Sequence, residues 1–534
     1  MNIIRYFALR LASLTMLGLA PIAASAQTIC YVSPDGDNSS GSSWTTAFRT
    51  ISNGVSHATG VTNTVLVSNG IYTVSTPILV YSGITVTSLN GRAWTFVNGG
   101  GASQCFKIDH PDAVVDGFTI TNGVKVTGSY DTDGGGGVWI KRGVLRNCEI
   151  SSNTCSRAGG GIYIDMSATN AQVINCVIKN NWGSLGTSKG GGISLAGTGT
   201  VVRGCTISGN TALFVGGGVC SLSGQGLITD CIISNNTCPS GAGICFSGES
   251  GNYGPCNWTS TYCTVVNNIG SGVYMAYQGN GTISDSTIAN GTSYGVAFSG
   301  NSSNHPYLAK NCLIMGHTNS GARISSSGTI QNCQVVSNNA GSSGNAGGVH
   351  MVSGGRVLNC LIAYNSVDTV ATKYGGGFYI DTMGAQTNGS TVSGCTIVSN
   401  VAYRGGGIAF VSSTLTNFVV DCIVASNKAS NAGNDVYDYS PSTSSNAFYY
   451  SCIKVYTLAA GKNNITNREP LFVSAAAGNF RLLPDSPCIN AGTNEPWMNG
   501  AFDLDGHMRF DRFGGQVDIG AYEYLPDGTL FTVR

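Results

Sequence analysis

The chain has 534 residues, no formal net charge at pH 7, and only 10% charged residues. This balance lacks the basic excess that nucleic-acid binding requires, so we expect no nucleic-acid partner. Gly, Ser, Thr and Asn dominate instead, a composition typical of β-solenoids that act outside the cell.

Residues 1–26 have the organisation of a secretory signal peptide. Arg5 and Arg10 give a basic start, an apolar run extends from Leu11 to Ala20, and Ala24-Ser25-Ala26 offers a small-residue cleavage site. We therefore expect a mature chain that begins at Gln27 and is secreted or held at the cell surface. No later stretch approaches the length of a membrane span, so no transmembrane helix is expected.

Residues 27–90 carry weak repeats. Short apolar runs such as Val65-Leu66-Val67 and Ile78-Leu79-Val80 indicate strands. We interpret this region as an N-terminal cap with the first coils of a solenoid, because a stack of repeats needs a protected end.

Residues 91–462 repeat themselves. A Cys-x-aliphatic-x-x-Asn signature returns about every 21 to 35 residues and is followed by a glycine cluster and an aliphatic residue. The apolar positions alternate in steps of two, and no amphipathic stretch of helical length occurs after residue 30. This pattern predicts an all-β, right-handed parallel β-helix whose coils stack about 4.8 Å apart.

The recurring cysteines are expected to point inward and to stack as small hydrophobic side chains. Ser286 takes the position once. Among the 19 cysteines, we expect disulfides, if any form, between Cys220 and Cys245 or between Cys245 and Cys256. The predicted column contains Cys148, Cys176, Cys205, Cys231, Cys263, Cys312, Cys333, Cys360, Cys395, Cys422 and Cys452.

An asparagine follows the cysteine by five residues in most coils. Stacked asparagine amides can bond to one another and satisfy buried turn groups, so we predict an internal ladder. Glycosylation at Asn153, Asn210 and Asn236 is the alternative. The ladder positions are Asn153, Asn181, Asn210, Asn236, Asn268, Asn338, Asn365, Asn400 and Asn427. The glycine clusters predict sharp turns that only Gly enters without strain.

One polar group has the residue types of a polysaccharide lyase, which needs a base and often Ca²⁺ held by acidic side chains. The candidate catalytic residues are Asp131, Asp133, Lys141 and Arg142, with Asp109, His110 and Asp112 one coil earlier. The alternative is a solvated connection between coils.

A second group forms a regular row. Basic residues precede several glycine clusters, and tyrosines follow such clusters and are expected to point outward, as in glycan-binding grooves. The predicted ligand-binding residues are Arg157, Tyr163, Lys189, Lys373, Tyr379 and Arg404, with Tyr274, Asp165 and Asp381 beside them. The alternative is a solvated row of turns.

From residue 463 to 534 the repeat is lost and a compact C-terminal segment is expected. Asp503-x-Asp505-Gly506 matches only half of a Ca²⁺ loop, so a turn is favoured. The histidines His305, His317 and His350 share no metal-ligand spacing. No metal or cofactor is predicted, and Ca²⁺ enters only with the lyase alternative.

Several motifs carry family resemblances. Tyr31-Val32-Ser33-Pro34-Asp35-Gly36 and Asp116-Gly117-Phe118-Thr119-Ile120 resemble pectate-lyase-like β-helix proteins, and the Gly-Gly-Gly-Ile units are similar to repeats of chlamydial polymorphic outer-membrane proteins. Asn479-Phe480-Arg481-Leu482, Pro487-Cys488-Ile489-Asn490-Ala491-Gly492 and Asp518-Ile519-Gly520-Ala521-Tyr522-Glu523 resemble the choice-of-anchor Q domain of bacterial secreted β-helix proteins.

These resemblances imply the fold and the compartment and leave the activity open, because β-helix proteins include enzymes and adhesins. The leading hypothesis is an adhesive or glycan-binding scaffold whose partner is a polysaccharide or cell-surface glycan. The alternative is a polysaccharide lyase, or a related carbohydrate-active enzyme, that acts on uronic-acid polysaccharide.

Overall fold

The structure is a computed structural model. It describes residues 28–58, 62–126, 134–248, 256–276, 279–300, 307–325, 328–342, 344–370, 372–381, 389–412, 416–439, 446–454, 463–510 and 515–526. The predicted signal peptide and the candidates Asp131, Asp133 and His305 lie outside these ranges.

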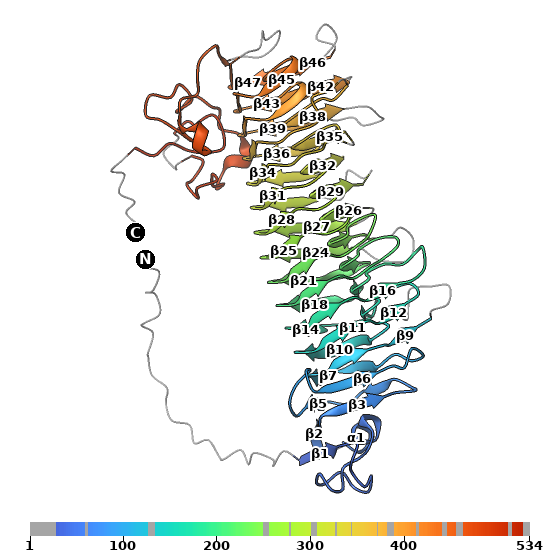
Figure 1. The fold of residues 1–534 in the computed structure, drawn as a ribbon. Coiled ribbons are helices and arrows are strands. Elements are labelled where there is room, and N and C mark those ends of the chain that lie inside the picture. Colours follow the sequence, from blue (N-terminus) through green and yellow to red (C-terminus); the bar gives the residue numbers. More distant parts are fainter. Residues whose placement is uncertain are drawn as a thin grey trace, which may run out of the picture.

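The described chain winds into a parallel β-solenoid, with the C-terminal segment beside its upper coils (Figure 1). Each regular coil contributes one short strand to each of three faces, and the strands of each face pair in parallel with those of the coils above and below. The all-β solenoid predicted from the sequence is confirmed.

The first and second faces belong to one 28-stranded sheet, because the long strands β7 (Phe106–Asp116) and β10 (Val138–Arg146) run through both. The other strands of the first face are β4 (Ile78–Val80), β13 (Ile162–Ile164), β17 (Ile193–Leu195), β20 (Val219–Ser221), β23 (Ile244–Phe246), β26 (Val273–Ala276), β29 (Val296–Ser299), β32 (Ala322–Ser325), β35 (Val349–Ser353), β38 (Phe378–Asp381), β42 (Ile408–Ser412) and β46 (Val436–Asp438).

The second face follows the first in each coil. Its other strands are β1 (Thr28–Val32), β2 (Thr62–Val67), β5 (Thr85–Ser88), β14 (Gln172–Ile174), β18 (Thr198–Arg203), β21 (Gly224–Thr229), β24 (Cys256–Thr261), β27 (Gly279–Ser284), β30 (Leu308–Lys310), β33 (Thr329–Gln331), β36 (Arg356–Leu358), β39 (Thr391–Ser393), β43 (Phe418–Val420) and β47 (Ala447–Tyr449).

The third face is the 16-stranded sheet. Its strands are β3 (Gly70–Thr73), β6 (Thr95–Asn98), β8 (Thr119–Thr121), β11 (Glu149–Ser151), β15 (Val177–Lys179), β19 (Thr206–Ser208), β22 (Ile232–Ser234), β25 (Thr264–Val266), β28 (Thr287–Ala289), β31 (Leu313–Met315), β34 (Gln334–Val336), β37 (Leu361–Ala363), β40 (Thr396–Val398), β44 (Ile423–Ala425), β48 (Cys452–Ile453) and β49 (Ile465–Thr466).

Small elements complete the fold. The helix α1 (Ile51–His57) buries Ile51 and Val55 at the first coil, and Thr50 caps it by accepting a hydrogen bond from the Asn53 N–H. This helix could not be predicted from the sequence, because seven residues are too few to show a periodic pattern. The others are β9 (Val124–Lys125), β12 (Thr154–Cys155), β16 (Trp182–Gly183), β41 (Val401–Arg404), β45 (Lys428–Ala432), β50 (Phe472–Ser474), β51 (Asn479–Leu482), η1 (Ala475–Ala477) and η2 (Pro496–Met498).

The predicted cysteine column is confirmed from Cys148 to Cys422, with each side chain in the solenoid core. Each thiol donates to the carbonyl two residues earlier at 3.1–3.4 Å, so the polar edge of the sulfur is satisfied without a disulfide. All 19 cysteines are buried free thiols.

The prediction for Cys452 is wrong. Cys452 aligns with the outward residue Ile423 of the coil below, and Ser451 occupies the inward position. The Ser451 hydroxyl donates to the Tyr449 carbonyl at 2.9 Å, as the column thiols do to theirs. The column therefore ends in a serine, and Cys452 faces the C-terminal segment instead.

The asparagine ladder is confirmed. The Asn210 amide donates to Asn236 Oδ1 at 3.0 Å and to the Ile178 carbonyl at 2.9 Å, and Asn210 Oδ1 accepts from the Asn181 amide. A left-handed backbone conformation occurs one position before the ladder residues, for example at Asn180 and Asn235. The ladder side chains are thus free to point inward.

His317 takes the place of an asparagine in the ladder. Its Nδ1 accepts from the Gly291 N–H at 3.2 Å and its Nε2 lies 3.1 Å from the Ile288 carbonyl, while its own N–H donates to Asn338 Oδ1. A neutral imidazole with the proton on Nε2 satisfies all of these partners. Burial lowers the pKa of His317 to about 4.

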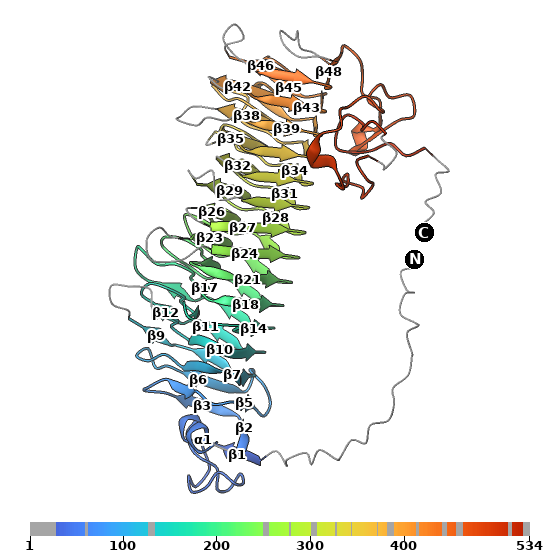
Figure 2. The same ribbon diagram turned by 180° about the vertical axis from the view of Figure 1, so that it is seen from behind.

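The C-terminal segment packs on the outer side of the third face near the end of the solenoid (Figure 2). Phe480 contacts a cluster with Leu361 and Val398, and Leu482 belongs to a second cluster with Ile423. Buried Arg509 donates to the Asn359 side chain at 3.2 Å. Within the described ranges, no helix is long and apolar enough to span a membrane.

Candidate functional site

The outward side chains of the first face form a column that rises one residue per coil. The register links Trp139, Tyr163, Ser194, Cys220, Cys245, Tyr274, Ala297, Arg323, His350, Tyr379, Ala409 and Tyr437. The predicted row of tyrosines therefore does share one face. Its two halves, however, have different surroundings.

The N-terminal half of the row is covered by the turns that precede the strands. Tyr163 points away from the main core as expected, but it is fully buried in a small cluster with Val215 and Cys220. Lys189 is also buried, and Arg157 is half-buried. These side chains hold the turns on the first face and do not form an open surface.

The C-terminal half is an aromatic and basic surface. The Arg404 guanidinium carbon lies 5.9 Å from the ring centre of Tyr374 and 5.4 Å from those of Tyr403 and Tyr437. The Tyr374 ring also lies 6.3 Å from that of Tyr379 and 5.9 Å from that of Tyr437. We call Arg404 with these four tyrosines the tyrosine cluster.

Strand register and hydrogen bonds fix Arg404 within the cluster. Arg404 pairs with Tyr374 of the coil below, and its Nε donates to Asn431 of the coil above at 3.0 Å. Its Nη1 lies 3.4 Å from the hydroxyls of both Tyr374 and Tyr437. The guanidinium is therefore held in one orientation before any ligand arrives.

Glycines make this arrangement possible. Gly375 and Gly405, which directly follow Tyr374 and Arg404, have positive φ angles of 72° and 64°. A Cβ on the next glycine, Gly376, would meet the Gly406 carbonyl oxygen at 2.4 Å. The predicted need for Gly at sharp turns and close approaches is thus confirmed, and the turns project the cluster residues outward.

Two ionisable groups in or beside the cluster, Tyr379 and His350, are uncharged at neutral pH. Burial, together with Asp381 and Tyr374, raises the pKa of Tyr379 to about 12, and Tyr379 is only 7% exposed. Burial and the nearby Arg323 lower the pKa of His350 to about 4. Lys373, whose ammonium donates to the Gly344 carbonyl at 3.2 Å, adds the second cation beside Arg404.

The structure thus brings together Lys373, Tyr379 and Arg404 from the predicted set, and the sequence analysis missed Tyr374, Tyr403 and Tyr437. A signal for Tyr437 was present: it follows Gly433 by four residues, as Tyr379 follows Gly375. The coil of Tyr437 lacks the Gly-Gly-Gly-Ile motif, so its spacing was not recognised.

The predicted lyase group is already paired internally. Arg142 Nε lies 2.7 Å from Asp109 Oδ1, and Lys141 Nζ lies 4.0 Å from Asp109 Oδ2. His110 lies 3.9 Å from Asp112, which is exposed. Because Asp131 and Asp133 are not among the described residues, the catalytic role of this group stays a prediction.

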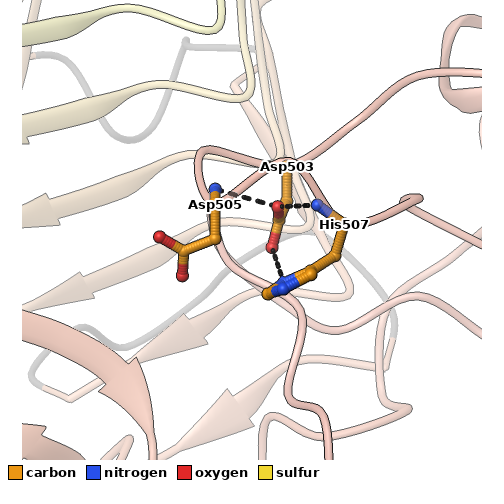
Figure 3. Close-up of side chains that lie close together, drawn as sticks. All are labelled: Asp503, Asp505 and His507. Carbon is orange, nitrogen blue, oxygen red and sulfur yellow. Dashed lines mark hydrogen bonds and ion pairs between the residues drawn. The ribbon is translucent and has the colours of Figure 1, made fainter. Parts of the chain in front are cut away.

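Asp503, Asp505 and His507 place one potential metal-ligand atom each within 4.8 Å of one another (Figure 3). Asp503 Oδ1 accepts from the N–H groups of Asp505 and His507 at 2.9 and 2.7 Å, and its Oδ2 accepts from the Glu523 N–H. Asp505 forms an ion pair with Arg481. These bonds give the carboxylates a structural role in a turn.

Cavities among the described residues lie away from the tyrosine cluster. One, of about 520 Å³, lies between the third face and the loop that carries Phe502, with Lys310 and Gln334 on its wall. Two smaller ones, of about 310 and 300 Å³, lie beside Tyr72 and beside Met166. The tyrosine cluster is therefore an outer surface feature that does not line any of these cavities.

Comparison with solved structures returns chains of low identity. Pectate lyase Pel9A is 14% identical, with 93% of this chain and 98% of that chain covered at a TM-score of 0.28. The catalytic unit of a GH87 α-1,3-glucanase from Streptomyces thermodiastaticus is 16% identical over 64% of each chain, with a TM-score of 0.40. The A-module of the mannuronan C-5 epimerase AlgE6 from Azotobacter vinelandii is 11% identical, with 78% and 93% covered and a TM-score of 0.27. These identities are too low to transfer a function.

Comparison with curated proteins gives no match. The resemblances of the sequence to the choice-of-anchor Q domain and to chlamydial repeats therefore stay predictions. A family model, by contrast, described as the right handed beta helix region, matches residues 108–280, 218–382 and 271–449. These overlapping matches cover most of the chain. It belongs to the right-handed β-helix family.

Proposed function

We propose that the protein is a secreted or cell-surface scaffold that binds a polysaccharide through the tyrosine cluster. The observation that carries the proposal is the Arg404 guanidinium held among three tyrosine rings at 5.4–5.9 Å. Aromatic faces pack against the C–H faces of sugar rings, and a fixed guanidinium can bind a carboxylate through two parallel hydrogen bonds.

The geometry favours a polymer over a small ligand. Tyr374, Arg404 and Tyr437 come from three successive coils, and stacked coils repeat about every 4.8 Å along the solenoid axis. An extended chain that lies along the axis would meet one of these groups per coil. Because the cluster is held by internal hydrogen bonds, little ordering accompanies binding.

The charge of the cluster favours an acidic polysaccharide. Arg404 and Lys373 are cationic, whereas the nearby Tyr379 and His350 are neutral at pH 7. We expect binding to polygalacturonate that weakens as salt is added, because screening reduces the attraction between exposed charges.

Affinity electrophoresis in gels that contain polygalacturonate tests the proposal. Arg404→Ala should weaken retardation about fivefold, because the variant loses the cation that contacts the polysaccharide. Tyr437→Ala should have a similar effect. The matched control is Arg356→Ala, which removes an exposed arginine from the second face. Equal retardation of wild type and Arg404→Ala, or no retardation of the wild type, would contradict the proposal.

The same protein and polysaccharide can be used to distinguish the lyase alternative from the scaffold. A lyase would release unsaturated uronates that absorb ultraviolet light, and its activity would depend on Lys141 or Arg142. We expect no such absorbance from the wild type, with or without Ca²⁺. Product formation that is lost in Arg142→Ala would instead favour catalysis at the Asp109 group.

A further inference from the structure

Cys452 and Cys488 meet where the C-terminal segment packs on the last coils. Cys452 lies in β48 on the outer side of the third face, and its N–H donates to the Cys422 carbonyl at 2.9 Å. Cys488 follows Pro487 in the C-terminal segment, and its carbonyl accepts from the Ile519 N–H at 2.9 Å. Both side chains are fully buried in one cluster with Ile423.

These two thiols differ from those of the cysteine column. A column thiol, such as that of Cys422, donates to the carbonyl two residues earlier at 3.1 Å. The Cys452 thiol lies 3.8 Å from the Arg468 carbonyl, and it shares a side-chain hydrogen bond with Cys488 in the same buried cluster. The two thiols also form an isolated pair and are not part of a long column, so a single disulfide would leave no unpaired thiol between them.

We propose that Cys452 and Cys488 form a disulfide that joins the C-terminal segment covalently to the end of the solenoid. The two thiols lose two protons and two electrons when the S–S bond forms. A disulfide oxidant, such as glutathione disulfide or a thiol oxidoreductase, accepts these electrons and is reduced to two thiols. The reaction passes through a mixed disulfide that the second cysteine resolves.

The bond is expected to form before the segment is fully docked. The hydrogen bond that the Cys488 thiol donates to Cys452, followed by burial, raises the pKa of the Cys488 thiol. A protonated, buried thiol attacks a disulfide slowly, since the thiolate is the nucleophile. Oxidation should therefore be fast during folding and slow once the cysteines are buried as thiols.

The bond would have a clear mechanical role. The strands of the solenoid end at β49. The strands β50 and β51 of the C-terminal segment form a separate two-stranded sheet. Beyond β49, the segment is therefore held on the solenoid by side-chain packing and scattered hydrogen bonds. A disulfide between residues 452 and 488 would prevent it from leaving the third face of the last coils, which it covers.

Peptide mapping tests the proposal directly. The full chain is refolded with reduced and oxidised glutathione, denatured without reductant, alkylated with N-ethylmaleimide and digested for mass spectrometry. We expect a cross-linked peptide that contains Cys452 and Cys488, with the column cysteines alkylated. Alkylation of both residues, or a bond from either to another cysteine such as Cys245, would overturn the proposal.

A second readout does not depend on refolding yield. In the oxidised wild type, dithiothreitol should speed proteolysis within residues 463–526 about tenfold. A disulfide commonly changes the equilibrium constant for unfolding by more than a factor of about ten. The Cys452→Ser/Cys488→Ser double variant should be insensitive to the reductant. Cys422→Ser, a column variant one coil below, should keep the full response. An equal response of the double variant would contradict the bond.

Discussion

Individual residue types determine the packing inside the solenoid, because each type recurs at the same position of successive coils. The asparagine ladder places every amide between two coils, so an amide that is removed leaves partners on both sides without a bond. A buried polar group without a partner costs more than a missing contact. The ladder is therefore the part of the core most sensitive to substitution.

Asn210→Ala should lower the free energy of unfolding by about 1–3 kcal/mol, because the Asn181 amide and the Ile178 carbonyl lose their partners. Urea denaturation gives the change in midpoint. Asn210→Asp is the matched comparison: it keeps the size and the acceptor but loses the N–H donor. An unchanged midpoint for Asn210→Ala would contradict the ladder.

His317 gives the core an acid-sensitive point. Its pKa is lowered to about 4 by burial, whereas an unfolded histidine titrates near pH 6.5. Between these values the unfolded chain binds a proton that the folded chain does not, so stability falls as the pH drops from about 6.5 to 4. The expected loss reaches about 3 kcal/mol at pH 4.

His317→Asn should restore the ladder and remove this part of the pH dependence. Denaturation at pH 7 and pH 4.5 measures it, and the stability difference between the two pH values should shrink in the variant. The buried His350, whose pKa is also lowered to about 4, should keep its own contribution. If the variant lost as much stability at acid pH as the wild type, His317 would not be the cause of this pH dependence.

The residue scale also shows what the sequence could predict. Cys and Asn recur at fixed spacing, so the inward positions from Cys148 to Cys422 could be identified without a structure. Cys452 could not, because Ser451 and Cys452 are both small and the repeat ends there. Only the strand register shows that the serine replaces the thiol.

At the scale of elements, the third face changes character along the solenoid. In the last coils its outward residues Leu361, Val398 and Ile423 are apolar and are covered by the C-terminal segment. Sequence patterns could indicate that this segment ends the repeat, but not which face it covers. That choice depends on long-range contacts such as the one between Arg509 and Asn359.

The segment is expected to loosen at alkaline pH. Buried Asp421 accepts from the Thr493 N–H at 2.7 Å, and burial raises its pKa to about 8; burial likewise raises the pKa of Glu523 to about 8. Because these folded pKa values exceed the unfolded ones, their contribution is present at low pH and lost as the pH rises through 8. The loss between pH 7 and 9 is about 1.4 kcal/mol per group.

Hydrogen–deuterium exchange of residues 463–510, corrected for intrinsic rates, should therefore increase from pH 7 to pH 9. Asp421→Asn keeps the acceptor for Thr493 but cannot ionise, so its increase should be smaller. Exchange in the solenoid strands β15 and β19 serves as the internal control. Identical pH responses of wild type and Asp421→Asn would show that Asp421 does not control docking.

At the scale of the whole molecule, the stacked coils hold the tyrosine cluster on the outer side of the solenoid. The sequence identified Tyr379 and Arg404 of the tyrosine cluster, together with the neighbouring Lys373, because each lies one or two residues from a glycine cluster. It could not show which tyrosines are accessible. Tyr163 and Tyr379 have the same local pattern and are both buried, whereas Tyr374 and Tyr437 are partly exposed.

Tyrosine nitration with tetranitromethane, mapped by mass spectrometry with and without polygalacturonate, tests the central proposal most directly. We predict that the polysaccharide protects Tyr374, Tyr403 and Tyr437. Tyr262 and Tyr81, which are 64% and 50% exposed in other parts of the solenoid, should react equally in both samples. Unchanged nitration of the cluster, or protection confined to other tyrosines, would contradict binding at this surface.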